Sequence, residues 1–426
     1  MKLAILDPGF SHLGTHHESV NLGIVCGLSK KGIQSVVFTS ENLRPTVNPE
    51  TSLYQMNVIP FFKTLCYLPE NVPFTQRGYD ALVHSFFLEL ESLFESPHME
   101  DVNLIYLHTG YSFHLQGLGK ALNNSRLKTL NRLIISLMFF PESPAHQNRL
   151  NEEDVQEYLC YKTALNVLAE ASQKSKISID VATSCRTFQT TYQKLWSLGP
   201  VDIHPAINQY SRFQSLKEPQ LASDRVLLYL GAPKTDKGIE FITEICQITS
   251  EKFPETQFVI QMNLSFPGFS SEFGGLITKL RKASEISHNI TLKEDYLEPD
   301  SYYSLLNSCS VITLLYQPTK YKFKTSGIFW DGLLLKKDKW LVSRDTWIAD
   351  ELSELQIPFQ SVEYGDVSSA LSGLEKLINH PSIHVMKKLD NTVPESKYLK
   401  QLTSSFSDWL FSKAMQSTIN IEEGFS

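Results

Sequence analysis

Short runs of strand-forming residues alternate with longer helical patterns along almost the whole chain. This alternation is typical of parallel sheets with helices on both faces. In the first half, the predicted strands are Lys2–Asp7, Ser35–Thr39, Val102–His108, Arg132–Met138 and Ile177–Ala182, and the predicted helices are Glu18–Lys30, Tyr79–Glu95, Gly117–Asn123 and Glu153–Gln173. The pattern therefore predicts an α/β protein built on a parallel sheet.

A second series of strand-like runs follows an irregular stretch at Pro200–Leu221. Its predicted strands are Arg225–Gly231, Gln257–Met262, Ile290–Lys293, Ser310–Leu315 and Trp340–Ser343. Because 426 residues are too many for one ordinary core, the two series predict two tandem Rossmann-like, doubly wound domains. Loop excursions are expected at Pro49–Pro73 and Leu264–Phe273, and the helical stripe of Lys397–Gln416 predicts a last helix that docks back on the first domain.

Composition excludes several classes of protein. The net charge of -7 disfavours binding to a nucleic-acid backbone, and nucleic acid is not an expected partner. The six cysteines are widely spaced without any Cys-x-x-Cys, so they are expected to be reduced core residues. No stretch approaches 18 apolar residues and the first apolar run ends early at Asp7, which predicts a cytoplasmic protein, at most peripheral at the inner face of the plasma membrane.

Ligands of open parallel sheets bind at the carboxyl ends of the strands, so four loops that follow predicted strands are candidate binding segments. The first, after Lys2–Asp7, contains Gly14 and Thr15 ahead of a predicted helix, where backbone amides favour an anion or a sugar hydroxyl. The second, after Arg225–Gly231, contains Lys234 and Lys237 beside a glycine turn, where they could neutralise a diphosphate. An ordinary turn in the first loop and solvated lysines in the second remain the alternatives.

The third loop leads into a helix start at Thr325, Ser326, Gly327 and Ile328. Thr325 or Ser326 is a candidate N-cap, Gly327 leaves the first amides open, and the helix dipole favours a phosphate there. Asp331, one turn into the helix, is placed to accept ribose hydroxyls. The alternative is a plain capped helix whose aspartate complements the dipole.

The fourth loop begins at His108, which is a candidate for contact with an acceptor or a sugar. A hydrogen-bonded structural histidine is the equally weighted alternative. Glu142, after the next predicted strand, is a further candidate for contact with a sugar or acceptor, against the alternative of a solvated carboxylate.

Two segments, Leu227–Gly231 and the following Asp236-Lys237-Gly238-Ile239, resemble the strand, loop and Lys-Gly pair of retaining GT-B-fold glycosyltransferases of the family four type, the glycosyl transferases group 1. Val201–Asn208 with Arg212 and Phe213 is similar to the interdomain segment of that family, and Tyr302–Val311 to the helix and strand before its donor site. The resemblance covers most of the chain, closely in the second half and loosely in the first.

The resemblance implies a GT-B architecture with a cleft between the domains. It divides the chain into an acceptor-side domain at 1–208, a nucleotide-sugar-binding domain at 209–396 and a crossover helix at 397–426. Lys237 takes the role of the diphosphate-binding lysine, Ser326, Gly327 and Ile328 supply amides, and Asp331 stands where a ribose-binding Glu is expected. The arginine position of the family is Ala232 here, so Lys234 is its candidate replacement, and the first Glu of the paired-Glu motif falls at Phe323.

The function implied is a retaining, metal-independent glycosyltransferase that moves a hexose or N-acetylhexosamine from a UDP-sugar to a glycan or lipid-linked acceptor. Its context would be synthesis of bacterial surface polysaccharide or glycoconjugates, and no cofactor or metal is expected beside the donor. Lys237, Lys234, His108 and Glu142 are the candidate catalytic residues. Two alternatives use the same architecture, namely a nucleotide-sugar 2-epimerase and a non-catalytic nucleotide-sugar-binding protein.

Overall fold

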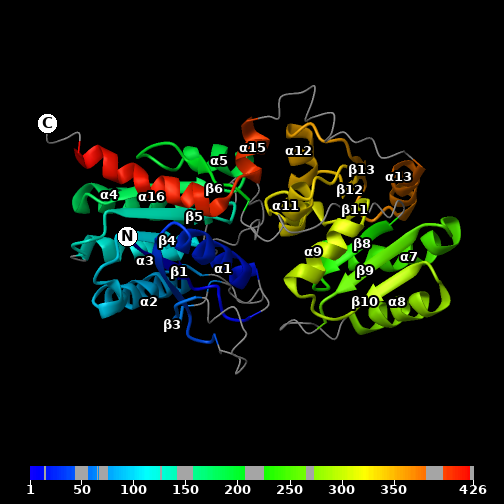
Figure 1. The fold of residues 1–426 in the computed structure, drawn as a ribbon, viewed down its shortest axis with the longest axis horizontal. Coiled ribbons are helices and arrows are strands. Elements are labelled where there is room, and N and C mark those ends of the chain that lie inside the picture. Colours follow the sequence, from blue (N-terminus) through cyan, green and yellow to red (C-terminus); the bar gives the residue numbers. More distant parts are fainter. Residues whose placement is uncertain are drawn as a thin grey trace. The chain divides into compact units, whose positions relative to one another are not determined.

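The computed structural model describes residues 1–13, 16–43, 56–64, 66, 75–124, 127–141, 157–206, 225–264, 273–379 and 397–422. The chain forms two compact units, with unit 1 comprising Met1–Ser211 and Ser404–Ser426 and unit 2 comprising Arg212–Thr403. Each unit contains one parallel sheet flanked by helices (Figure 1). The prediction of two tandem doubly wound α/β units is confirmed.

The sheet of unit 1 has the strand order β3-β2-β1-β4-β5-β6-β7. Its strands are β1 Lys2–Asp7, β2 Gln34–Ser40, β3 Val58–Phe62, β4 Leu104–Leu107, β5 Arg132–Leu137, β6 Ser178–Thr183 and β7 Asp202–Ile203. Strand β3 lies within the predicted loop excursion Pro49–Pro73, so that prediction is wrong for this segment. The strand lies at the edge of the sheet and pairs with β2. An edge strand tolerates a proline, and Pro60 is the reason that the sequence pattern did not indicate a strand here.

Helices pack against both faces of this sheet. They are α1 His16–Ser29, α2 Gln76–Phe94, η2 Pro97–Met99, α3 Ser112–Asn124, α4 Glu157–Ser175, α5 Arg186–Gln193 and α16 Phe406–Glu422. Leu3 and Ile5 of β1 share a buried apolar cluster with α1 and α16, while a smaller cluster joins α2, α3 and α4. Alternate residues of a strand point to opposite faces, which is why a run of buried residues such as that of β1 supports both layers.

The sheet of unit 2 has the strand order β10-β9-β8-β11-β12-β13. Its strands are β8 Arg225–Gly231, β9 Gln257–Met262, β10 Ile290–Lys293, β11 Val311–Leu314, β12 Trp340–Ser343 and β13 Gln360–Val362. Its helices are η4 Thr235–Lys237, α7 Ile239–Lys252, α8 Gly274–Ile286, α9 Pro299–Ser308, α10 Pro318–Tyr321, α11 Gly327–Leu334, α12 Trp347–Glu354, α13 Val367–Asn379 and α15 Lys397–Thr403. Both sheets reverse their strand order once, between β1 and β4 in unit 1 and between β8 and β11 in unit 2. Such reversals are where doubly wound sheets bind ligands.

The C-terminal segment returns to unit 1 as predicted, but not as one helix. It breaks at Ser404 and Ser405, where the Ser405 hydroxyl accepts a hydrogen bond from the Asp408 amide at 3.3 Å and caps α16. Helix α15 belongs to unit 2, where the Tyr398 hydroxyl donates to Glu351. Helix α16 places Phe406 in the core of unit 1. The apolar residues of the predicted stripe therefore pack in two cores, those of α15 in unit 2 and those of α16 in unit 1.

No helix in the described part of the chain is long and apolar enough to span a membrane. The six cysteines all lie among the described residues and form no disulfide; five are buried, and Cys26 is half-buried.

Candidate functional site

The loop after β8 is held in a tight, glycine-dependent conformation. Gly231 and Gly238 both have positive φ, at 106° and 73°. A Cβ built on Gly238 would lie 2.3 Å from the Leu315 carbonyl oxygen, a separation no side chain tolerates. Gly238 is therefore required both by its left-handed backbone and by the close approach of the next loop.

Lys237 lies half-buried beside Gly231, with its Nζ 3.1 Å from the point where a Cβ on Gly231 would lie. Burial lowers the pKa of Lys237 from 10.5 to about 8, and repulsion from Lys234 and Lys324 adds to the shift. Asp236 opposes the shift and pairs with Lys324 at 3.1 Å. Lys237 is thus repelled by two lysines and attracted by one aspartate, and an anion bound among them would relieve the repulsion. We call Lys234, Asp236, Lys237 and Lys324 the lysine cluster.

The start of α11 is capped by Ser326, one of the two residues the sequence offered for that role. The Ser326 hydroxyl accepts a hydrogen bond from the Phe329 amide at 3.4 Å. Gly327 is exposed, and a Cβ there would meet no described residue within 4 Å apart from its chain neighbours and its own helix backbone. The amides of Gly327 and Ile328 are the first of the helix and have no carbonyl partner within it, so the open space in front of them suits an anion.

The lysine cluster and the α11 start belong to loops that contact each other. The Gln317 amide donates to the Asp236 carbonyl oxygen at 2.9 Å, and Lys324 bridges the loops through its ion pair with Asp236. Because β8 and β11 are paired neighbours in the sheet, their carboxyl ends bring these loops together. Side-chain cations and helix-start amides are therefore combined at the strand reversal of unit 2.

Asp331 is buried, and its carboxylate faces α9. It accepts hydrogen bonds from the hydroxyls of Tyr302 at 2.9 Å and Tyr303 at 3.5 Å. Burial raises the pKa of Asp331 to about 7, although the two tyrosine hydroxyls act in the opposite direction. Tyrosine hydroxyls thus contact both carboxylate oxygens. The assignment of Asp331 to a ribose stays a prediction.

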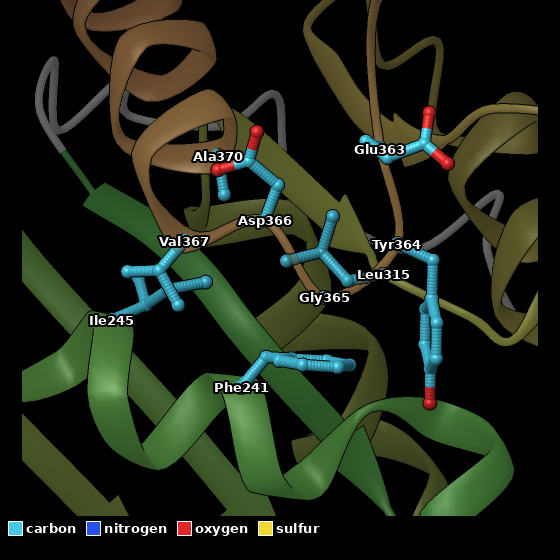
Figure 2. Close-up of a pocket in the computed structure, with 9 residues that line it drawn as sticks. All are labelled: Phe241, Ile245, Leu315, Glu363, Tyr364, Gly365, Asp366, Val367 and Ala370. Atoms are coloured by element: carbon cyan, nitrogen blue, oxygen red, sulfur yellow. The ribbon is translucent and has the colours of Figure 1, made fainter.

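A small cavity of about 10 Å³, with room for about one water molecule, lies between α7, the end of β11 and the start of α13 (Figure 2). Its lining residues are Phe241, Ile245, Leu315, Glu363, Tyr364, Gly365, Asp366, Val367 and Ala370. The Phe241 and Tyr364 rings meet edge to face at 4.7 Å, and the Tyr364 hydroxyl donates to the Thr235 carbonyl oxygen at 3.2 Å. The cavity is too small for a nucleotide, and Tyr364 in its wall connects it to the turn of Lys234 and Lys237 through Thr235.

At the strand reversal of unit 1, the structure gathers a second polar cluster. Asp7 ends β1 and His108 follows β4, while His17 and Asn21 come from the first turns of α1. Nδ1 of His17 lies 2.8 Å from Asp7 Oδ1, Nδ1 of His108 lies 3.4 Å from Asp7 Oδ2, and Asn21 Nδ2 donates to Asp7 Oδ2 at 2.6 Å. All four side chains are buried. We call this set the Asp7 cluster.

Electrostatics keep Asp7 ionised inside unit 1. Burial alone would raise the pKa of Asp7, but the imidazoles of His17 and His108 hold it far below its ordinary value. Burial lowers the pKa of His108, with Asp7 opposing. Thr109, beside His108, has a φ of 61°, which is rare for a β-branched residue and marks a strained backbone at this point.

The structure brings some of the predicted site residues together and separates others. Lys234, Lys237, Thr325, Ser326, Gly327 and Ile328 lie on the two contacting loops of unit 2, whereas His108 lies within unit 1 and is fully buried. Gly14, Thr15 and Glu142 lie outside the described residues. Sequence reasoning missed Asp7, His17 and Asn21 as site residues. The signal available was an aspartate ending a strand and a histidine at the start of the next helix.

Comparison with known proteins gives structural matches only. No protein-family model matches the sequence, and a search of curated proteins returns no significant match. Similar solved structures include the trehalose-phosphate synthase (UDP-forming) of Burkholderia xenovorans in complex with glucose-6-phosphate, with 9% identity, 97% of this chain and 100% of that chain covered, and a TM-score of 0.63. A second is an E. coli trehalose-6-phosphate structure bound with UDP-2-fluoro glucose, with 10% identity, 97% of this chain and 99% of that chain covered, and a TM-score of 0.60. A third is the sucrose-phosphate synthase of Thermosynechococcus elongatus, with 14% identity, 100% of this chain and 99% of that chain covered, and a TM-score of 0.52.

Together with the two parallel sheets, these full-length matches decide the architecture. The chain has the GT-B fold. At these identities the similarity concerns the fold, and it is consistent with the resemblance to family four in the sequence. In this GT-B chain, both strand reversals carry polar residues, and among the described residues the surplus of cations lies at the reversal of unit 2.

Proposed function

We propose that this chain is a hexosyltransferase that uses a nucleoside diphosphate sugar, with UDP-sugar as the donor. The observation that carries the proposal is the contact between the lysine cluster and the α11 start. A diphosphate needs several positive groups converging from more than one direction, and this pair of loops supplies both side-chain ammonium groups and backbone amides.

The chemistry required of these groups is stabilisation of the leaving diphosphate. As the bond from the sugar to the β-phosphate breaks, negative charge grows on the phosphate oxygens. Lys237 is the principal group for this task, because it is half-buried in the loop and its ammonium is already crowded by other cations. Groups fixed in advance where charge develops stabilise the transition state without reorganising.

The structural neighbours support this donor class. One is bound with UDP-2-fluoro glucose and another is described as UDP-forming and holds glucose-6-phosphate. We propose a sugar or sugar phosphate as the simplest acceptor, alongside the glycan or lipid-linked acceptor implied by the sequence resemblance. Retention of anomeric configuration, transfer without a metal ion and a role in surface polysaccharide synthesis are proposed from that resemblance alone.

The test is UDP binding by isothermal titration to the wild-type chain and to Lys237→Ala. Loss of a hydrogen bond to a charged group should weaken binding by about 1.5–3 kcal/mol. Lys252→Ala is the matched control, because Lys252 lies at the far end of α7, the helix that follows Lys237, and pairs with Glu375 at 2.6 Å on the surface. Equal affinity of wild type and Lys237→Ala would overturn the placement of the diphosphate.

Transfer itself is tested with UDP-glucose and UDP-N-acetylglucosamine against sugar and sugar-phosphate acceptors, with released UDP and product measured. UDP release with formation of a glycoside supports the transferase. Conversion of the donor to its 2-epimer with no acceptor would instead identify an epimerase. Tight donor binding with neither reaction across a broad acceptor panel would identify a non-catalytic binding protein.

A further inference from the structure

The Asp7 cluster has the composition and spacing of a metal site. Its Asp7, His17 and His108 each offer one ligand atom, and these atoms all lie within 4.8 Å of one another. They come from three separate elements, the end of β1, the first turn of α1 and the residue after β4. We propose that Asp7, His17 and His108 form a binding site for a divalent transition-metal ion of the zinc type, inside unit 1.

The donor atoms select the class of ion. Two imidazole nitrogens and one carboxylate oxygen suit Zn²⁺ and its first-row neighbours, whereas Mg²⁺ and Ca²⁺ prefer oxygen ligands throughout. To bind the ion, His17 would shift its ring proton from Nδ1, which now donates to Asp7, to Nε2, and so present the Nδ1 lone pair. The ion would take the place of the hydrogen that links His17 and Asp7 at 2.8 Å.

The surroundings of the three ligands fit the same interpretation. Metal-binding carboxylates are usually held by a further hydrogen bond, and Asn21 Nδ2 supplies one to Asp7 at 2.6 Å. The Asn21 Oδ1 atom is buried in the same cluster and has no hydrogen-bond partner among the residues that the structure describes. A buried polar atom without a partner is unusual, and a bound ion or ligand would account for it. Thr109 Oγ1 lies 2.9 Å from His108 Nδ1, the ring nitrogen that faces Asp7, so an ion bound to this nitrogen would replace that contact.

The backbone also leaves room for this arrangement. A Cβ on Gly9 would lie 2.4 Å from Cε1 of His17, so only glycine in the turn after β1 lets the His17 ring reach Asp7. The site is formed by unit 1 alone. It is therefore independent of the diphosphate site proposed for unit 2, and either proposal can fail without the other.

The first experiment uses the full chain without a histidine tag, stripped with chelator and dialysed against ZnCl₂. We expect about one zinc per chain by elemental analysis. Replacing the zinc with Co²⁺ should give the visible absorption of a site with nitrogen and oxygen ligands. A spectrum of hydrated Co²⁺, or a thiolate charge-transfer band that points to the cysteines, would overturn the proposal.

The second experiment compares variants of similar size. Asp7→Asn and His17→Gln should each weaken zinc binding by at least about 100-fold, and Asn21→Ser by about 10–100-fold, the range for residues that support metal ligands. His204→Gln is the control, because His204 is buried in unit 1 but is not among the three ligands, and its zinc affinity should match wild type. Circular dichroism verifies folding; if Asp7→Asn is unfolded, Asn21→Ser and the Co²⁺ spectrum decide. Unchanged zinc binding in folded Asp7→Asn would refute the site.

Discussion

The two strand reversals of this chain occupy equivalent places in two similar sheets, yet their electrostatics are opposite. In unit 1, Asp7 is fully buried and its oxygens are contacted by His17, His108 and Asn21. In unit 2, Lys237 is repelled by Lys234 and Lys324 and attracted by Asp236, and Lys324 remains half exposed. The same topology therefore supports two kinds of site. In unit 1 the charge of Asp7 is balanced by neighbouring side chains, whereas in unit 2 the excess positive charge of the lysines can be balanced by a bound anion.

The physical reason for the contrast is solvent access. A carboxylate that is removed from water survives only when several groups hydrogen-bond to it, so the Asp7 cluster is closed and specific. Lysines that keep contact with water can remain in excess, which leaves them available to an anion. The difference suggests that the first site contributes chiefly to the folded state of unit 1 and the second to ligand binding.

The largest expected effect is on stability, from Asp7→Ala. Removal of the carboxylate leaves buried polar partners without their acceptor and should lower the free energy of unfolding by about 3–5 kcal/mol. Urea denaturation with chelator present measures it. Asp408→Ala, which breaks an exposed ion pair with Lys31, should change stability by about 0–1 kcal/mol. Similar losses for both variants would remove the distinction between a buried and a solvated pairing.

The second prediction concerns Asp331, the buried carboxylate of unit 2. Its pKa of about 7 in the folded chain lies above the ordinary 3.8, so the folded state binds the proton more tightly than the unfolded state does. The contribution of Asp331 to stability is therefore fully present below about pH 4 and is lost as pH rises through about 7. The change is on the order of 1–4 kcal/mol.

Denaturation of wild type and Asp331→Asn between pH 4 and pH 8 isolates this contribution, since the variant has no proton to lose at that position. The difference between the two proteins should grow in favour of the variant as pH rises. A difference that stays constant with pH would show that Asp331 is ionised throughout.

The third prediction tests the backbone of the lysine loop, the segment after β8 that carries Lys234 and Lys237. Gly238→Ala forces a side chain into a left-handed backbone and against Leu315, with an expected loss of about 1–3 kcal/mol and weaker UDP binding. Gly274→Ala is the control, since its Cβ would meet no described residue within 4 Å apart from its chain neighbours and its own helix backbone. It should shift stability by at most about 1 kcal/mol. Thermal unfolding with and without UDP reports both effects; no effect at Gly238 would mean that the loop can move.

The smallest effect is the pH dependence of UDP affinity. Because the pKa of Lys237 is lowered to about 8, its charge is present below pH 8 and is lost above it. Affinity should fall by at most about tenfold per pH unit above 8, as expected for one linked proton. Titration at pH 7, 8 and 9 measures it, and Lys237→Arg should flatten the profile. A fall that persists in Lys237→Arg would point to another group.

The sequence determined the framework because local patterns determine regular elements. The predicted bounds of Lys2–Asp7, Gln257–Met262 and Trp340–Ser343 coincide with strands β1, β9 and β12. Buried parallel strands are short apolar runs that local sequence reveals well. The edge strand β3 was not predicted because Pro60 lies in its middle, and a proline within a run argues against a strand.

The candidate site residues also differ in whether a local sequence pattern indicates them. The lysine loop and the Ser326 helix start carry local signals, a glycine turn and a capping residue, and both were predicted. The Asp7 cluster joins residues about 100 positions apart in the chain, and no local pattern records that β1 and β4 are neighbours.

The sequence by itself thus determined that this chain folds as two doubly wound α/β units and that one loop of the second is rich in lysine. Only the tertiary structure decided which charges are buried together, that Asp331 faces two tyrosines, and that the last apolar stripe is shared between α15 and α16. Periodicity and propensity act over a few residues, whereas burial and pairing depend on neighbours that are distant along the chain.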